Sequence, residues 1–188
     1  MTALADALRG VTVRLEQAGD ARVVEQLTAD AFDDPRVPQL VESLRCSDAW
    51  MPEASFVAVH EGSVVGQALF TRSLLDAPRR LVDVLVLSPL SVAPDVQRRG
   101  VGTALLRHAL EQLRTRDEPL IFLEGSPSFY PRFGFQPAAP LGFRRPSLRI
   151  PKAAFMVRPQ PTYEPWMTGT VVYAEAFWRH DCVGLRDL

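Results

Sequence analysis

The stretch from Leu90 to Thr103 constrains the fold most, because it joins a strand pattern to a helix pattern without a linker. Its centre is the sequence QRRGVG at 97–102. Glycines carry no Cβ, so an anion can approach this backbone, and the free N–H groups of a helix N-terminus point at it with about half a positive charge. The pattern predicts a phosphate-binding junction with Arg98 and Arg99 at its rim.

A different interpretation of the same glycines is a tight structural turn that binds nothing. The spacing is not the dinucleotide fingerprint Gly-x-Gly-x-x-Gly, and it is not a P-loop, because no Gly-Lys-Ser/Thr follows. Any bound phosphate therefore belongs to another kind of ligand.

Composition limits the classes of partner. A chain of 188 residues that is 47% hydrophobic can bury a substantial core, so we expect a single domain over 1–188. A net charge of −1 provides no basic field for nucleic acid. No leader pattern and no membrane-length apolar run is present, so we expect a cytoplasmic protein without a membrane partner. Cys46 and Cys182 lack metal-ligand spacing, and no metal is expected.

Hydrophobic periodicity predicts strands alternating with helices. Strands are expected at 11–15, 54–60, 63–74, 81–92, 119–123, 153–157 and 170–177, and helices at 37–44, 99–115 and 126–133. A further helix, capped by Asp20, has an apolar stripe of Val24, Leu27, Ala31 and Phe32.

Pro89 lies inside the predicted strand 81–92 and cannot donate a ladder hydrogen bond, so we expect a bulge or splay there. That distortion would free backbone groups of Leu90 and Val92. An extended ligand with amide groups could then pair with them as a surrogate strand.

A second motif, GSPSFYPRFGF at 125–135, follows the strand at 119–123. Together with the junction at 97–103, it resembles the GCN5-related N-acetyltransferase (GNAT) family, particularly its YhbS-like bacterial branch. The segments AAFMV at 153–157 and GTVVYAEAF at 169–177 extend the resemblance. Many branch members start the motif with Gly-Asp-Pro or Gly-His-Pro, whereas this chain has Gly125-Ser126-Pro127, so a charge near the site is missing.

The resemblance implies an α/β fold with a mixed, twisted, mostly antiparallel sheet flanked by helices. The two central strands, 81–92 and 119–123, would splay apart and admit acetyl-CoA. The residues implied to bind it are Leu90, Ser91, Val92, Gln97, Arg98, Arg99, Gly100, Val101, Gly102, Thr103, Ser128 and Arg132. Ser128 can instead cap the short helix, and Arg132 can instead pair with a carboxylate.

The implied reaction is attack of a primary amine on the acetyl thioester, without a covalent enzyme intermediate. The amine has to lose a proton, because its pKa is about 10, and the departing thiolate, of pKa about 8.5, benefits from a donor. Tyr130 is the implied donor, although a core aromatic would look the same. Glu124 is the candidate base, although it can also be a solvated strand end; Asp83 and Ser88 are weaker candidates.

The acceptor is left open between a small-molecule amine and a protein amine. We expect residues 33–47 and the Pro-rich loop with Tyr163 and Trp166 to shape its pocket. The alternative function is a non-catalytic acyl-CoA-binding or sensing protein of the same fold. Apolar residues in the last strand could support a homodimer.

Overall fold

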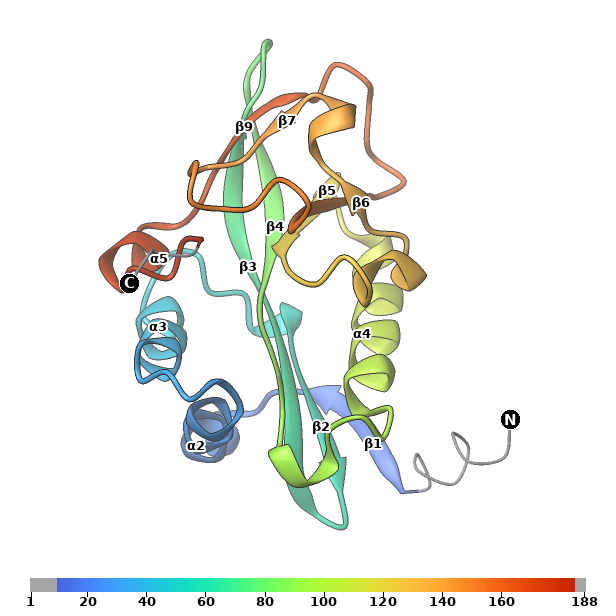
Figure 1. Ribbon diagram of the computed structural model, residues 1–188. Coiled ribbons are helices and arrows are strands. Elements are labelled where there is room, and N and C mark those ends of the chain that lie inside the picture. Colours follow the sequence, from blue (N-terminus) through green and yellow to red (C-terminus); the bar gives the residue numbers. More distant parts are fainter. Residues whose placement is uncertain (1–9, 185–188) are drawn as a thin grey trace.

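The computed structural model describes residues 10–184, which form a twisted sheet with helices on both faces (Figure 1). Within these residues the sheet order is β1-β2-β3-β4-β5-β8-β6, while β9 pairs with β3 and β7 pairs with β9. Only the β4–β5 and β7–β9 pairs of the described strands are parallel. The strands are β1 (Val11–Leu15), β2 (Ser55–His60), β3 (Ser63–Asp76), β4 (Leu81–Val92), β5 (Leu120–Glu124), β6 (Gln136–Pro137), β7 (Phe143–Arg144), β8 (Phe155–Pro159) and β9 (Gly169–Val172). The predicted fold class is confirmed.

Two apolar cores lie on the two faces of this sheet. The helices are α2 (Ala21–Phe32), α3 (Arg36–Arg45), α4 (Val101–Gln112) and α5 (Glu175–Arg179). Strand β4 alternates between the cores: Val84 and Val86 pack on the α2–α3 side, and Leu85 and Leu87 on the α4 side. None of the helices between residues 10 and 184 has the length and apolar character needed to cross a membrane.

The bulge predicted from Pro89 is present in β4. Ala68 of β3 pairs with Leu90, and Phe70 pairs with Leu87, so two β4 residues oppose one on β3. The register between β4 and β5 covers only Leu85 with Ile121 and Val86 with Phe122. Beyond these pairs the two central strands diverge, as predicted.

Backbone geometry shortens two predicted helices. Helix α4 begins at Val101 rather than 99, because Arg98 and Gly100 have φ values of 60° and 93°. It ends at Gln112 and tightens into a 3-10 turn, Leu113–Thr115. The helix expected at 126–133 is only the 3-10 turn Tyr130–Phe133, which contains Pro131.

The strands near the C-terminus also differ from expectation. The strand predicted at 170–177 ends at Val172, and the good helix formers in AEAF at 174–177 lead into α5. The strand predicted at 153–157 starts at Phe155, because the N–H groups of Ala154 and Phe155 both donate to the Pro151 carbonyl in a turn. The short strands β6 and β7 were not predicted, because two residues carry no periodicity.

Helix α2 differs from the prediction in its N-terminal cap and in its apolar stripe. The Asp20 carboxylate makes no capping bond to α2; it accepts the Gln17 N–H at 2.8 Å and the Arg14 guanidinium. Val24 and Leu27 are buried as predicted, but Phe32 is 41% exposed. Phe32 therefore does not pack in the core, and it lines the two cavities of the candidate site.

Candidate functional site

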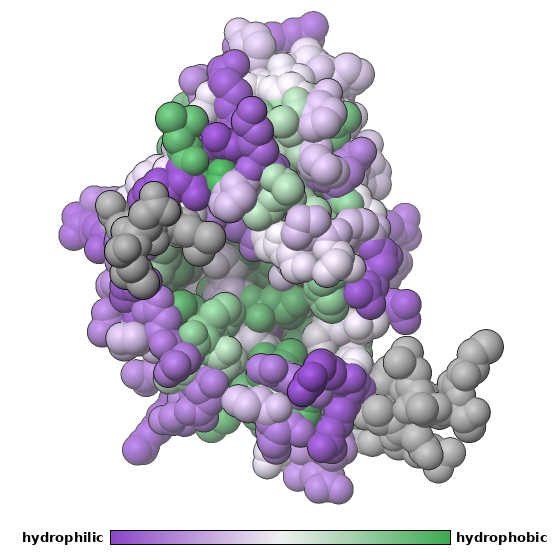
Figure 2. Space-filling view, viewed as in Figure 1, coloured by the Kyte–Doolittle hydropathy of each residue, from purple (hydrophilic) through white to green (hydrophobic). Residues whose placement is uncertain are grey.

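Two cavities meet between α2, α4 and the diverging central strands. The junction cavity, of about 540 Å³, lies at the N-terminus of α4. The tyrosine cavity, of about 560 Å³, lies beyond it, against Tyr130 and residues 181–184. Both are lined by Phe32, Leu90 and Phe129, so they form one continuous groove. Figure 2 shows the middle of this face hollowed, with apolar residues in the hollow and polar residues around it.

The junction cavity gathers most of the residues predicted to bind acetyl-CoA. Its predicted lining residues are Leu90, Val92, Gln97, Arg98, Gly100, Gly102, Thr103 and Arg132. Arg107 lines it as well and was not predicted, although it lies at helical spacing from Thr103.

Gly102 leaves space that the protein itself does not fill. A Cβ at this position would only reach ordinary contact, at 3.5 Å from Val92 and 3.9 Å from Phe129. Glycine costs about 1 kcal/mol relative to alanine inside a helix. Since no neighbouring atom requires glycine here, the space it leaves belongs to the groove.

The free edge of β4 faces the groove. The Ala93 N–H donates to the Val65 carbonyl at 2.9 Å, so residue 93 directs its backbone toward β3. Antiparallel pairing alternates, and the backbone groups of Leu90 and Val92 therefore point the other way, toward the gap left by β5. The Gln97 side chain donates to the Val92 carbonyl at 3.1 Å.

Four of the predicted residues do not line either cavity. Ser91 and Val101 are 1% and 3% exposed, because they face the interior. Arg99 and Ser128 are exposed, and the Ser128 hydroxyl pairs with Ser126 at 2.8 Å.

Arg132 lines the junction cavity without the carboxylate partner considered from sequence. Its Nε donates to the Phe129 carbonyl at 2.9 Å, and the guanidinium lies 4.9 Å from the centre of the Phe129 ring. Its charge is therefore available to a ligand at the edge of the groove.

Tyr130 lines the tyrosine cavity from the start of the 3-10 turn. Its ring packs edge-on against Phe129 at 5.0 Å and Phe135 at 5.8 Å. A Cβ on Gly125 would overlap this ring, so glycine at this position leaves the room that the ring occupies. Burial raises the pKa of Tyr130 to about 12, and the hydroxyl is protonated at neutral pH.

Glu124 lines the same cavity at the end of β5. It is not the solvated strand end considered from sequence: burial raises the pKa of its carboxyl, although a hydrogen bond from the Gly184 N–H, at 3.0 Å, opposes this. Burial and then the Glu124 charge raise the pKa of Tyr173, whose hydroxyl faces the same carboxylate. A desolvated carboxylate of raised pKa is a stronger base than an exposed one.

Sequence reasoning missed several charged residues of the tyrosine cavity. Arg36 contacts Asp34 at 2.7 Å and Asp181 at 3.6 Å. Hydrogen bonds from Arg36 lower the pKa of Asp34, and burial raises the pKa of Cys182. Asp34 and Arg36 fall in the expected region 33–47, whereas Asp181 and Cys182 carry no signal of their proximity.

Tyr163 and Trp166 of the Pro-rich loop, which was expected to shape the acceptor pocket, line neither the junction cavity nor the tyrosine cavity. Trp166 lies under the guanidinium groups of Arg79 and Arg80, at 5.1 and 5.5 Å, and Tyr163 packs on Phe143. Residues 181–184 line the tyrosine cavity instead. Of the weaker base candidates, Ser88 lines this cavity, whereas Asp83 lines a separate one beside Arg80.

Comparison with known proteins identifies the family of this chain. Residues 12–138 match the acetyltransferase (GNAT) domain family. The Escherichia coli (strain K12) N-acetyltransferase YjhQ, itself uncharacterized, is 34% identical over 128 residues, which are 68% of this chain and 71% of YjhQ.

Two solved structures share the fold over most of the chain. The GNAT N-acetyltransferase YhbS from Escherichia coli, in complex with CoA, has a TM-score of 0.79 and 25% identity, covering 90% of this chain and 92% of YhbS. A GNAT acetyltransferase from Brucella melitensis, in complex with acetyl-CoA, has a TM-score of 0.71 and 29% identity, covering 89% and 97%. The chain described here belongs to the GNAT acetyltransferase family.

Proposed function

We propose that residues 1–188 form one acyltransferase domain that transfers the acetyl group of acetyl-CoA to a primary amine by direct attack. This proposal rests on the continuous groove that the junction cavity and the tyrosine cavity form. It starts at the N-terminus of α4, follows the free edge of β4 and ends at Tyr130 and Glu124. The complexes of YhbS with CoA and of the Brucella protein with acetyl-CoA support the same ligand for this groove.

The junction cavity would hold the pyrophosphate and the pantetheine arm. The first N–H groups of α4 offer donors for phosphate oxygens, and Arg98, Arg107 and Arg132 add charge around them. The backbone groups of Leu90 and the Val92 N–H offer the edge of a strand to the pantetheine amides, whereas the Val92 carbonyl already accepts the Gln97 side chain. The room beside Gly102 fits a ligand that lies close to the helix.

Glu124 would accept the proton of the acceptor amine, directly or through a water. Removing a proton from an amine of pKa about 10 costs roughly 4 kcal/mol at pH 7, and a base of raised pKa reduces that cost. The amine nitrogen then bonds to the acetyl carbon while the carbon–sulfur bond breaks. Holding the two reactants together in the groove can contribute about 7–11 kcal/mol in favourable cases.

Tyr130 would stabilise the departing sulfur. A hydroxyl whose pKa is raised to about 12 stays protonated and can donate a hydrogen bond to the thiolate. Because a thiol has a pKa of about 8.5, full proton transfer from this tyrosine is uphill by roughly 5 kcal/mol. The hydrogen bond, rather than a completed proton transfer, therefore supplies most of the stabilisation.

The remaining proposals concern partners. The acceptor would be a small-molecule or protein amine that enters beside Asp34, Glu124 and Asp181, which line the tyrosine cavity. We also propose a cytoplasmic location, where acetyl-CoA is available, and a homodimer, with no metal, nucleic acid or membrane involved.

The first experiment measures CoA and acetyl-CoA binding by calorimetry. Gly102→Leu should weaken both by about tenfold or more, because the side chain fills the groove beside Val92 and Phe129. Gly19→Leu is the matched control, since a Cβ at Gly19 meets nothing within 4 Å. Equal affinity in the two variants would contradict the assignment of the groove.

A panel of primary amines then tests transfer by following release of the free thiol. Turnover with any amine supports the acetyltransferase. Tight acetyl-CoA binding without acetylation of any amine would favour the non-catalytic acyl-CoA-binding protein instead.

A further inference from the structure

A third cavity lies outside the groove and shares no lining residue with it. This basic pocket, of about 370 Å³, lies between β7, β8 and the connection at 145–152, and its charged lining residues are Arg144, Arg145 and Lys152. Phe143, Leu148 and Phe155 supply apolar lining, and no carboxylate of the described chain lines it. The volume is within the range of about 300–1,000 Å³ typical of small-molecule sites.

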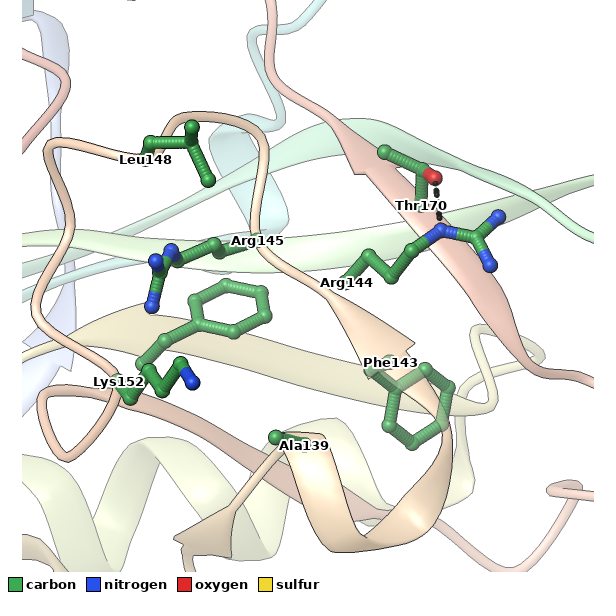
Figure 3. A pocket seen from close by; sticks show the side chains of 8 residues that line it. Ala139, Phe143, Arg144, Arg145, Leu148, Lys152 and Thr170 are labelled. Carbon is green, nitrogen blue, oxygen red and sulfur yellow. Dashed lines mark hydrogen bonds between the residues drawn. The ribbon is translucent and has the colours of Figure 1, made fainter.

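Arg145 and Lys152 have no hydrogen-bond or ion-pair partner among residues 10–184. The buried Nε of Arg145 has no hydrogen bond within residues 10–184, and Lys152 makes no hydrogen bond or ion pair there. Arg144 instead donates to the Thr170 hydroxyl at 2.8 Å. Figure 3 shows Arg145 and Lys152 at one end of the pocket and the Arg144–Thr170 pair at the other.

A buried donor without an acceptor destabilises the fold, and a carboxylate that reaches the Arg145 guanidinium would supply that acceptor. Its two oxygens match the edge of a guanidinium, and a second cation beside it strengthens the pair. The charge at this end of the pocket is therefore suited to a single carboxylate.

The apolar residues beside these cations are suited to the rest of a ligand. Leu148 is 88% exposed, whereas Phe143 and Phe155 are each 2% exposed. A hydrocarbon or aryl group that covers Leu148 removes apolar surface from water, which favours binding. The pocket thus offers an anionic contact and an apolar contact to one molecule.

We propose that the basic pocket binds a small amphipathic organic carboxylate, with the carboxylate on Arg145 and Lys152 and its apolar body against Leu148. The site lies one strand from the groove, because Phe155 of β8 is the register partner of Glu124. It requires neither CoA nor acetyl transfer, so its failure and the failure of the acetyltransferase proposal are distinguishable.

The chain has one lysine, Lys152, which makes a specific readout possible. A lysine-acylating reagent is applied at pH 8, and modification of Lys152 is followed by peptide mass spectrometry. The probe is 4-phenylbutyrate, with 4-phenylbutanol as its uncharged analogue. We expect 4-phenylbutyrate to slow modification saturably, with or without CoA, and 4-phenylbutanol to give no protection at the same concentration.

Two variants test the two halves of the pocket. Leu148→Asp puts a carboxylate on an exposed side chain, which does not threaten folding, and Arg145→Gln removes the unpaired guanidinium. Each should weaken protection by about tenfold or more, whereas Arg22→Gln, which removes an exposed arginine outside the pocket, should not. Absence of protection in the native chain, equal protection in Leu148→Asp, or displacement of the probe by CoA would overturn the proposal.

Discussion

At the scale of single residues, the two parts of the Tyr130 side chain have different roles: the ring packs against its neighbours, and the hydroxyl is the proposed hydrogen-bond donor. Its ring packs on Phe129 and Phe135 and is held against Gly125. Tyr130 lines the tyrosine cavity, and burial raises the pKa of its hydroxyl to about 12. The ring and the hydroxyl can therefore be tested separately.

Tyr130→Phe keeps the ring and removes only the hydroxyl. We expect turnover with the best amine of the panel to fall by about 10²-fold, because the thiolate loses its hydrogen-bond donor. CoA affinity, measured by calorimetry, should change less than about twofold, since the ring contacts remain. Unchanged turnover would remove Tyr130 from the chemistry.

If Glu124 is the base, the reaction rate depends on pH, and the burial of Glu124 determines the pH at which the rate rises. Its pKa is raised, so the carboxylate forms at a higher pH than an exposed glutamate, and kcat/KM should rise as pH increases through that raised pKa. Glu124→Gln should lower turnover and lose this dependence. A pH profile of the variant that parallels the native one would exclude Glu124 as the base.

The same burial predicts that Glu124→Gln does not destabilise the fold. A carboxyl whose folded pKa is raised contributes stability at low pH that is lost as pH rises through the folded pKa. Glutamine is neutral throughout and its carbonyl can still accept the Gly184 N–H. The thermal unfolding midpoint at pH 7 should therefore stay equal or rise, which separates loss of activity from loss of structure.

At the scale of elements, a buried ion pair connects α3 to the residue that follows β1. Arg45 of α3 contacts Glu16, just after β1, at 2.5 Å, and their side chains are 13% and 4% exposed. Ser55 and Gln67 donate to the other oxygen of Glu16 at 2.5 and 2.8 Å. This network joins α3, the end of β1, β2 and β3, on the side of the sheet that carries α2.

Arg45→Met leaves the Glu16 carboxylate buried without its cation. We expect the free energy of unfolding in urea to fall by about 3 kcal/mol. Removing one partner of a buried ion pair leaves the other charge unpaired, which costs more than replacing both charged residues. The double variant Arg45→Met with Glu16→Gln should recover part of this loss. A single variant as stable as the native chain would show that the pair contributes little.

Local elements were the most predictable part of the fold and of the site. The junction at 97–102 and the bulge at Pro89 follow from glycine, proline and helix-start chemistry, which act over a few residues. Both are present, and most of the predicted ligand-binding residues line the junction cavity.

Residues brought together by tertiary packing were not predictable in the same way. Phe32 fits the apolar stripe of its helix, but it is 41% exposed and lines the groove. Asp181 and Cys182 lie more than 140 positions from Asp34 in the sequence, and no local pattern indicates that they share a cavity with it. The apolar content of residues 174–177 favoured the end of a predicted strand, although these residues are good helix formers and lead into α5.

At the scale of the whole molecule, residues 180–184 connect three distant parts of the chain across the tyrosine cavity. His180 pairs with Ser43 of α3 at 2.7 Å, and Asp181 accepts from Arg149 at 2.9 Å. The Gly184 N–H donates to Glu124 at 3.0 Å. This segment therefore positions the Glu124 carboxylate and lines one side of the tyrosine cavity.

Gly184→Ala should displace this segment. Gly184 has a φ of +65°, and a Cβ there would lie 2.6 Å from the carbonyl carbon of Arg149 and 2.7 Å from the Ile150 nitrogen, which are backbone atoms. The segment has to move, and Glu124 loses a hydrogen bond that favours its charged form. We expect the KM of the acceptor amine to rise by about tenfold, because the displaced segment no longer orients the amine and Glu124. The pKa seen in the kcat/KM profile should also rise, because the charged form of Glu124 is less stabilised.

The control for this variant is Gly62→Ala in the β2–β3 turn. Gly62 also has a positive φ, +79°, but a Cβ there meets nothing within 4 Å, so this change adds backbone strain without displacing the C-terminal segment. CoA affinity should be unchanged in both variants, because neither position lines the junction cavity. If Gly62→Ala raised the acceptor KM equally, strain alone would explain the effect. If Gly184→Ala weakened CoA instead, the segment would belong to the CoA end of the groove.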